Sequence, residues 1–150
     1  MEREIKFRAK AVNTEMWVYG DLVHNQKVTK EGLEPRVMVG GYEVYKDTVC
    51  QFTGQTDKNV KRIYEHDILF DGLHYWLVYY DQDECCFALK DLEFECGQDG
   101  VLNTSYAKKA EVVGNKFDNP KLLKEKRESH PFRGESMSKI NITRGLNLKL

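Results

Sequence analysis

The sequence predicts a mainly β fold: N-terminal strands packed with a small, partly open barrel, then one short helix and a C-terminal arm. Three observations indicate it. Short apolar segments rich in β-branched and aromatic residues recur along the chain. Turn-forming residues separate these segments at short intervals. An Asp71-Gly72 pair, a strong hairpin signal, lies between two of them. The 150 residues suit one domain with a core of its own.

The first predicted strand runs from Glu4 to Ala9, where apolar and charged residues alternate. Strict alternation is typical of an antiparallel strand with one face buried and the other in water. We therefore expect the charged side chains of this strand to face solvent. The buried face would hold Ile5, Phe7 and Ala9, and the solvent face Glu4, Lys6 and Arg8.

The next segments complete the N-terminal part. Met16 to Val23, rich in Trp, Val, Tyr and Leu, is expected to pair with the first strand and to bend or bulge at Gly20-Asp21. His24 to Pro35 is polar, and we interpret it as a loop. Arg36 to Val39 is a short strand that ends at Gly40-Gly41.

The stretch from Thr48 to Phe70 carries the most specific pattern in the chain. Val49, Cys50 and Phe52 form a short apolar run that should end in a turn at Gly54, since glycine takes positive φ without a Cβ penalty. Residues 55–62 are polar and charged, as in an exposed connection. Residues 63–64 and 68–70 are apolar again and predict buried strands.

Short motifs in this stretch resemble those of a known family. They are Gln51-Phe52-Thr53-Gly54, Asp57-Lys58-Asn59, Ile63-Tyr64-Glu65 and Asp67-Ile68. Together they resemble the YopX-like family of phage and prophage proteins. The start, Arg3 to Ala9, and the close, Val113-Gly114-Asn115 with Asn119 to Leu123, are similar to the ends of the family's domain. The resemblance spans Met1 to about Leu123. It implies a β-barrel-like fold with a part similar to SH3-type barrels, and it implies no catalytic residues.

Two positions depart from the family pattern. Val60 stands where the pattern has Gly after Asn, and His66 stands where it has Gly before Asp. An Asn-Gly pair suits a type I′ turn because both central residues need positive φ. Positive φ is costly for a β-branched residue, so we expect the loop at Asn59-Val60 to adopt a different turn.

The second half predicts two hairpins and a closing strand. After the Asp71-Gly72 turn, Leu73 to Tyr80 is the most aromatic segment, and Cys85 to Leu89 is its returning strand. Glu111 to Phe117 is the last strand. The aromatic residues could stack nucleic-acid bases, but the hairpin is acidic, so we favour core packing with an interface patch.

The chain is expected to divide into a domain of residues 1–128 and an arm of residues 129–150. Asp118-Asn119-Pro120 should begin a helix of about residues 119–128, since an Asx cap before Pro is favourable at a helix start. Apolar residues of the arm are spaced mainly by two, which favours a segment that docks as a strand, including on a neighbouring subunit. They are Met137, Ile140, Ile142, Leu146, Leu148 and Leu150.

Candidate contact residues lie in and after the charged loop of the central stretch. Lys58, Lys61 and Arg62 could bind a phosphate or a protein partner, and a solvated loop is the plainer alternative. His66 lies between Glu65 and Asp67, so it could titrate near neutral pH or bind a metal; a surface turn histidine is more common.

The cysteines predict neither a disulfide framework nor a zinc site. Cys50, Cys85, Cys86 and Cys96 include no CxxC pair, and free thiols are expected in a cytoplasmic protein. A zinc site with His66 or His74, or a thiol enzyme that uses Cys85 or Cys86, remains an alternative. We expect no cofactor, no metal and no catalytic constellation.

Charge is divided unevenly along the chain. The formal net charge is −1, but residues 126–150 hold six Lys/Arg and two Glu, which gives +4 and leaves −5 for the rest. No apolar run is long enough for a membrane span and no signal peptide begins the chain, so we expect it in the bacterial cytoplasm. We expect a non-enzymatic phage or prophage accessory protein that binds itself and an unknown phage or host protein. The alternative is a nucleic-acid-binding small barrel that uses the charged loop and the basic tail.

Overall fold

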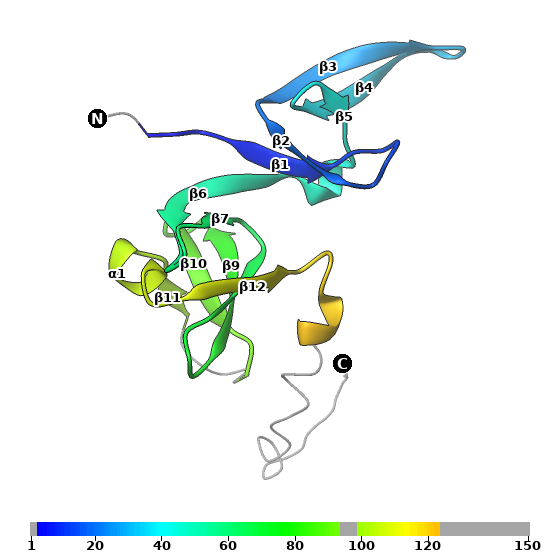
Figure 1. The fold of residues 1–150 in the computed structure, drawn as a ribbon. Coiled ribbons are helices and arrows are strands. Elements are labelled where there is room, and N and C mark those ends of the chain that lie inside the picture. The colour runs from blue at the N-terminus through cyan, green and yellow to red at the C-terminus, as the bar shows by residue number, and fades with distance from the viewer. Residues whose placement is uncertain (1–2, 94–98, 124–150) are drawn as a thin grey trace.

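The computed structural model describes residues 3–93 and 99–123, which form three antiparallel sheets and two short helices (Figure 1). One sheet has the order β2-β1-β6-β7, the second β3-β4-β5 and the third β11-β10-β9-β8-β12. The strands are β1 (Phe7–Lys10), β2 (Trp17–Gly20), β3 (Leu22–Thr29), β4 (Gly32–Val39), β5 (Tyr42–Glu43), β6 (Cys50–Thr56), β7 (Arg62–Tyr64), β8 (Asp67–Phe70), β9 (Tyr75–Asp81), β10 (Cys86–Asp91), β11 (Gly100–Val101) and β12 (Glu111–Asn115). The helices are η1 (Lys46–Thr48) and α1 (Thr104–Ala107). The mainly β prediction is confirmed.

Strand β1 lies at the centre of its sheet, between β2 and β6. The predicted pairing of the first two strands is confirmed, and Ala9 is fully buried with Val39 and Val44 in one core cluster. The prediction that Arg8 faces solvent is wrong, because Arg8 is only 7% exposed. Ile5, expected on the buried face, is also exposed (55%), because the strand begins only at Phe7. Arg8 is covered because Asp67 of the third sheet lies against the charged face of β1.

Residues 24–35 form a hairpin rather than the predicted loop. β3 and β4 pair along their whole length, from Leu22 opposite Val39 to Thr29 opposite Gly32. The hairpin projects from the body of the molecule (Figure 1), so most of its side chains stay in water. A strand that buries little carries little hydrophobic signal, and for this reason the sequence resembled a loop. The bend predicted at Gly20-Asp21 separates β2 from β3.

Gly54 lies within a strand and not at the predicted turn. β6 continues through it to Thr56, and the register with β7 shifts between Phe52 and Thr56. Gly54 has φ 93°, which an irregular position in a strand can require. The glycine signal was genuine, but it marks a bulge and not a strand end.

The strands of the third sheet agree with prediction more closely. The β8–β9 hairpin is present, with Phe70 opposite Tyr75, and its central turn residues are Gly72 and Leu73 rather than Asp71 and Gly72. The core cluster beside this sheet contains Ile63, Leu69, Val78, Leu89, Leu102, Ala107 and Ala110, and Trp76 packs against it. The sequence did not indicate α1 or β11, because each is too short to show a period.

The last described residues begin the predicted closing helix. Residues 120–123 are helical, so the start at Pro120 is confirmed. The predicted Asx cap is wrong in detail: Asn119 Oδ1 accepts from the N–H of Asn115, and Asp118 bonds Lys10 and Trp17. The remainder of the predicted helix and the arm of residues 129–150 lie outside the described residues.

Neither a closed barrel nor a spanning helix occurs in the parts described. The five-stranded sheet has β11 and β12 at its two edges and does not close on itself within residues 3–93 and 99–123. Within the same residues, no helix is long and apolar enough to cross a membrane.

Candidate functional site

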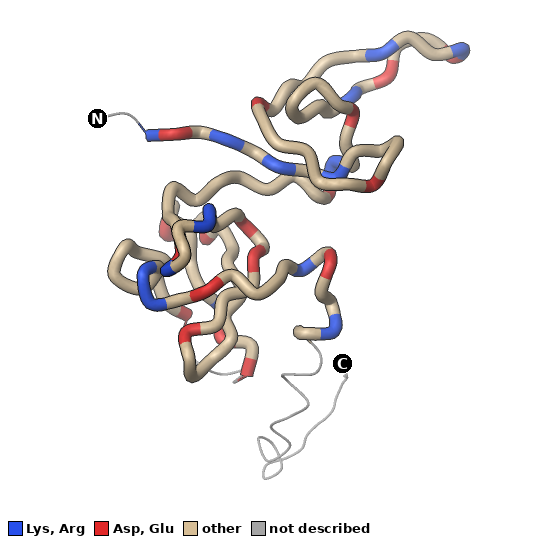
Figure 2. The backbone as a smooth tube through the Cα atoms, viewed as in Figure 1, with Lys and Arg blue, Asp and Glu red and all other residues tan. Residues whose placement is uncertain are grey.

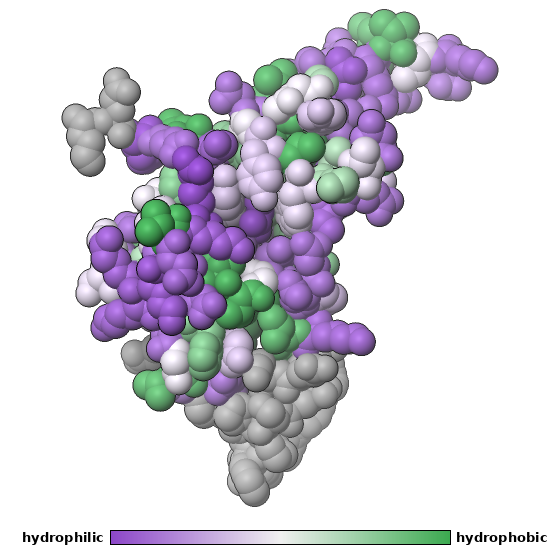
Figure 3. Space-filling model, in the orientation of Figure 1, coloured by the Kyte–Doolittle hydropathy of each residue, from purple (hydrophilic) through white to green (hydrophobic). Residues whose placement is uncertain are grey.

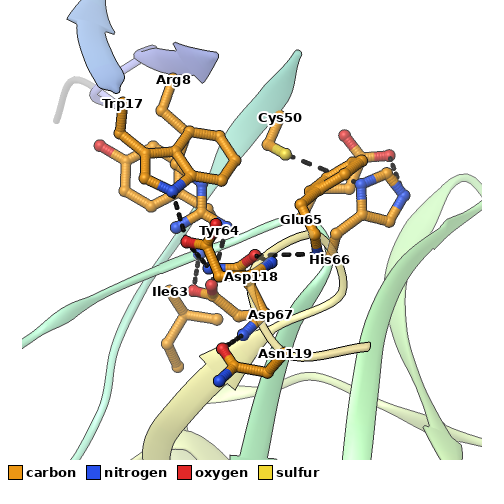
Figure 4. A network of polar contacts seen from close by, with 12 residues as sticks. Arg8, Trp17, Cys50, Ile63, Tyr64, Glu65, His66, Asp67, Asp118 and Asn119 are labelled. Atoms are coloured by element: carbon orange, nitrogen blue, oxygen red, sulfur yellow. Dashed lines mark hydrogen bonds and ion pairs between the residues drawn. The ribbon is translucent and has the colours of Figure 1, made fainter. Parts of the chain in front are cut away.

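A buried ion pair joins the N-terminal strand to the third sheet (Figure 4). Arg8 Nη2, from β1, donates to Asp67 Oδ1, at the start of β8, over 2.8 Å. The two side chains are 8% and 1% exposed. The other oxygen, Asp67 Oδ2, accepts from the backbone N–H of Tyr64 at 2.8 Å. Both carboxylate oxygens are therefore used, as a buried charge requires.

Aromatic rings enclose the guanidinium of Arg8. Its carbon Cζ lies 4.4 Å from the ring centre of Trp17 and 4.9 Å from that of Tyr64. Trp17 Nε1 in turn donates to Asp118 Oδ2 at 2.7 Å. Burial acts to raise the pKa of Asp118, but hydrogen bonds from Lys10, Trp17 and Asn115 outweigh it and lower the pKa to about 2. The network ties β1 and β2 to the end of the third sheet.

Beside this network, Cys50, His66 and Glu65 lie in the order of a nucleophile, a base and an orienting carboxylate. Cys50 Sγ is 3.7 Å from His66 Nδ1, and His66 Nε2 is 3.9 Å from Glu65 Oε2. The thiol, however, is fully buried and donates to the carbonyl of Thr48. Burial raises the pKa of Cys50 to about 11. A nucleophilic cysteine needs a thiolate and an open approach, and this site offers neither near neutral pH.

His66 is half-buried and belongs to the tight turn between β7 and β8. Its φ is 72°, its N–H donates to the carbonyl of Val78, and its carbonyl accepts from the N–H of Lys116. Its ring meets that of Phe117 edge to face, with centres 5.6 Å apart. Burial, with smaller contributions from Lys116 and Arg8, lowers the pKa of His66 from 6.5 to about 4. The imidazole is therefore neutral at pH 7.

The pKa of His66 predicts a loss of stability in mild acid. The unfolded chain takes up this proton near pH 6.5, whereas the folded protein takes it up only near pH 4. Stability should thus be full above pH 6.5 and fall, on the order of 2 kcal/mol from this group, as pH drops to 4. His66→Asn, which tolerates positive φ, should flatten this part of the curve. Urea unfolding from pH 7 to pH 4 measures it. An unchanged slope in His66→Asn would contradict the assignment.

The loop with the predicted contact residues is ordered by a buried aspartate. Asp57 Oδ1 accepts from the N–H groups of Asn59 and Lys61, and Asp57 Oδ2 accepts from that of Val112. The N–H of Val60 donates to the carbonyl of Asp57. We expected a turn other than type I′, and this is confirmed, because φ is positive at Val60 (65°) and not at Asn59. Val60 nevertheless takes the left-handed backbone that favours glycine.

Replacing Val60 with glycine should stabilise the protein by about 0.5–1 kcal/mol. The left-handed backbone costs an ordinary residue about 1–2 kcal/mol, and the greater freedom of unfolded glycine offsets about 0.5–1 kcal/mol of the gain. Val60 is 79% exposed, so little burial is lost. Thermal unfolding measures the stability of Val60→Gly and of a control, Val28→Gly. Val28 is also exposed (83%) but lies in β3, so Val28→Gly should destabilise the protein. A destabilised Val60→Gly would refute the strain.

The structure separates the four predicted contact residues into two groups. Lys58, Lys61 and Arg62 lie in or directly after the loop, and His66 lies at the other end of β7. Lys58 pairs with Glu111 at 3.7 Å, and Arg62 pairs with Glu4 at 3.1 Å.

Two further lysines join the loop on its surface. The N–H of Lys58 donates to the carbonyl of Ala110, which brings Lys108 and Lys109 beside the loop. Figure 2 shows blue segments next to α1. We call Lys58, Lys61, Arg62, Lys108 and Lys109 the basic loop surface. Sequence reasoning missed the last two because only the fold brings them there.

A groove of about 500 Å³ lies between the N-terminal segment, β6 and the β9–β10 hairpin. Aromatic and polar side chains share its lining, among them Phe52, Tyr80, Phe87 and Glu65. Cys85 and Cys86 also line it, and both are free thiols. Across residues 3–93 and 99–123, no group of three or more His, Cys, Asp or Glu side chains is arranged to hold a metal ion.

One face of the β3–β4 hairpin carries no charged side chain and has an exposed apolar tip, while its base is buried at Val39. Val28 is 83% exposed and Leu33 is 63% exposed, and they lie opposite each other near the tip. Green atoms are visible near the outer end of the hairpin in Figure 3. The side chains of this hairpin face are Leu22, His24, Gln26, Val28, Leu33, Pro35, Val37 and Val39. Its signal in the sequence is the spacing by two of Leu33, Pro35, Val37 and Val39, of which the first two fall in the predicted loop and the last two in the predicted strand Arg36 to Val39.

Comparisons with known proteins agree on the fold. A family model described as "YopX protein" matches residues 6–124. The crystal structure of protein EF1440 from Enterococcus faecalis is similar, with a TM-score of 0.51 and 21% sequence identity over 81% of this chain and 99% of that chain. At this identity the likeness concerns the fold alone. No curated protein matches the chain.

Proposed function

Because the chain belongs to the YopX protein family over residues 6–124, we propose that it is a phage or prophage accessory protein that binds other proteins and itself and catalyses no reaction. The family match and the likeness to EF1440 fix the fold and indicate no biochemical role. The proposal includes a partly open, SH3-like arrangement of β6 to β12.

The exposed apolar hairpin face carries this proposal. Single exposed apolar residues are normal on a protein surface, but a group of neighbouring ones, here Val28, Leu33 and Pro35, favours an interaction site. The hairpin also stands away from the body of the molecule (Figure 1), so a partner can reach it without rearranging the core. The fully buried thiol of Cys50 supports the non-enzymatic part of the proposal.

Light scattering of the purified full-length protein, with and without a short DNA duplex, tests the proposal. A defined multimer whose mass does not respond to the duplex supports the self-associating protein. A monomer at every concentration would overturn self-association. Deletion of residues 129–150 shows whether the C-terminal arm takes part, because an unchanged mass would exclude it from the contact.

The second candidate function is nucleic-acid binding, and the basic loop surface is the observation that favours it. The basic loop surface contains Lys108 and Lys109 as well as Lys58, Lys61 and Arg62, which the sequence indicated. Binding through phosphate contacts weakens steeply with salt. A gel shift at low salt that fades as salt is raised, and that Lys61→Glu abolishes, would support this function. No shift of any DNA or RNA would exclude it.

A further inference from the structure

We propose that the apolar hairpin face packs against the same face of a second copy of this chain, around a two-fold axis at the row of Gln26 and Pro35. This inference rests on the proposed self-association and names its surface. Gln26 lies opposite Pro35 in the hairpin, with Val28 opposite Leu33 on one side and His24 opposite Val37 on the other.

The distribution of charge on the hairpin selects the face. The hairpin face contains eight residues and no Asp, Glu, Lys or Arg. The opposite face carries Lys27, Glu34 and Arg36. Lys27 pairs with Glu43 at 2.9 Å, and Arg36 Nε donates to Asn25 at 2.9 Å. The charged face is therefore bonded within the chain and solvated, while the uncharged face has exposed apolar groups that water does not favour.

The same distribution points to a second copy as the occupant. Two identical charged surfaces repel each other when they meet, but an uncharged face meets its own copy without this cost. A two-fold contact also needs one patch that is complementary to itself. This face has both halves of such a patch, an exposed apolar tip and a groove whose lining includes Leu22, Pro35, Val37 and Val49.

The groove lies at the base of the hairpin. It measures about 390 Å³, and Leu22, Pro35 and Val37 from the hairpin and Val49 from the segment before β6 form its apolar lining. The other residues that line it are His24, Asn25, Arg36 and Lys46, so the two cations border the groove while the tip that enters it carries none. Leu22 and Val37 already pack against the core at their inner sides. Rotation about the row of Gln26 and Pro35 places the tip row of one copy, Val28 and Leu33, over the row of His24 and Val37 of the other. Each tip then fills the groove of its partner.

The contact should be weak enough to depend on concentration. A stable interface buries about 800 Å² per partner, and one face of a two-stranded hairpin is smaller than that. We therefore expect monomer and dimer to exchange over the micromolar range, with the dimer predominant at high concentration.

Analytical ultracentrifugation of the full chain, with a matched pair of variants, tests the inference. Val28→Asp places a charge in the tip row, inside the contact, and should weaken the dimer at least about tenfold, because a carboxylate loses its hydration there. Val23→Asp makes the same change on the same strand but on the opposite face, at a valine 46% exposed, and should leave the mass unchanged. Circular dichroism confirms that both variants are folded.

The outcomes separate the inference from the function on which it rests. A monomeric wild-type protein would overturn both. A wild-type multimer that Val28→Asp leaves intact would overturn only the hairpin contact and direct attention to the arm of residues 129–150. Equal dissociation by Val28→Asp and Val23→Asp would refute the choice of face. Loss of the dimer in Val28→Asp alone supports the inference.

Discussion

Asp67→Ala should lower the free energy of unfolding by about 3–5 kcal/mol, because it leaves the guanidinium of Arg8 buried without its counter-charge. The pair is 2.8 Å apart, and the side chains are 8% and 1% exposed, so water cannot replace the lost carboxylate. The N–H of Tyr64 also loses its acceptor. Urea unfolding at pH 7 measures the effect.

An exposed ion pair of the same kind provides the control. Arg62 and Glu4 are 3.1 Å apart with side chains 45% and 49% exposed. Such pairs contribute about 0–1 kcal/mol, so Glu4→Ala should change stability little. If Asp67→Ala costs no more than Glu4→Ala, the ion pair is not the link between the two halves of the chain.

A double replacement separates the cost of leaving one charge unpaired from the cost of losing both charged side chains. Arg8→Met with Asp67→Leu removes both charges and keeps apolar volume, and such exchanges are often neutral or stabilising. We expect the double variant to be clearly more stable than Asp67→Ala. A double variant as unstable as the single one would show that the unpaired charge is not the main cost, and that the lost acceptor of the Tyr64 N–H or the lost contact of the guanidinium with the rings of Trp17 and Tyr64 is.

The elements that sequence analysis predicted well are those whose apolar runs enter the core. Ile68 and Leu69 are fully buried in β8, and the run that contains them was predicted as a strand. The β9 strand and the closing strand were found for the same reason. The strand predicted at Arg36 to Val39 is the inner part of β4, and the rest of the β3–β4 hairpin was missed because it buries little.

The site was beyond prediction where it depends on contacts distant in sequence. Arg8 and Asp67 are 59 residues apart, and the alternation around Arg8 assigned it to solvent. Lys108 joins the basic loop surface only through the bond between Lys58 and Ala110. The positive φ of Val60 and His66, in contrast, had a local signal, since both stand where the family pattern has glycine.

Asp57→Ala should destabilise the protein by about 3 kcal/mol, the second large effect that we expect. The carboxylate is 4% exposed and accepts three backbone N–H groups at 2.8–2.9 Å. Hydrogen bonds to a charged group contribute about 1.5–3 kcal/mol each and are not additive. One of the three crosses to Val112 in β12, so the variant loses the link between the basic loop surface and the third sheet as well as the turn.

Asp81 offers a matched control, because its Oδ1 also accepts two backbone N–H groups in a hairpin turn. These are the N–H groups of Asp83 and Glu84, at 3.0 and 3.3 Å, and the turn is exposed. Asp81→Ala should cost about 1 kcal/mol, since water can replace the carboxylate there. Hydrogen exchange of the Val112 amide should accelerate in Asp57→Ala and not in Asp81→Ala. If both variants lose the same stability and Val112 stays protected, Asp57 orders only its own turn, and the basic loop surface is held to the third sheet by the bond from Lys58 to Ala110 instead.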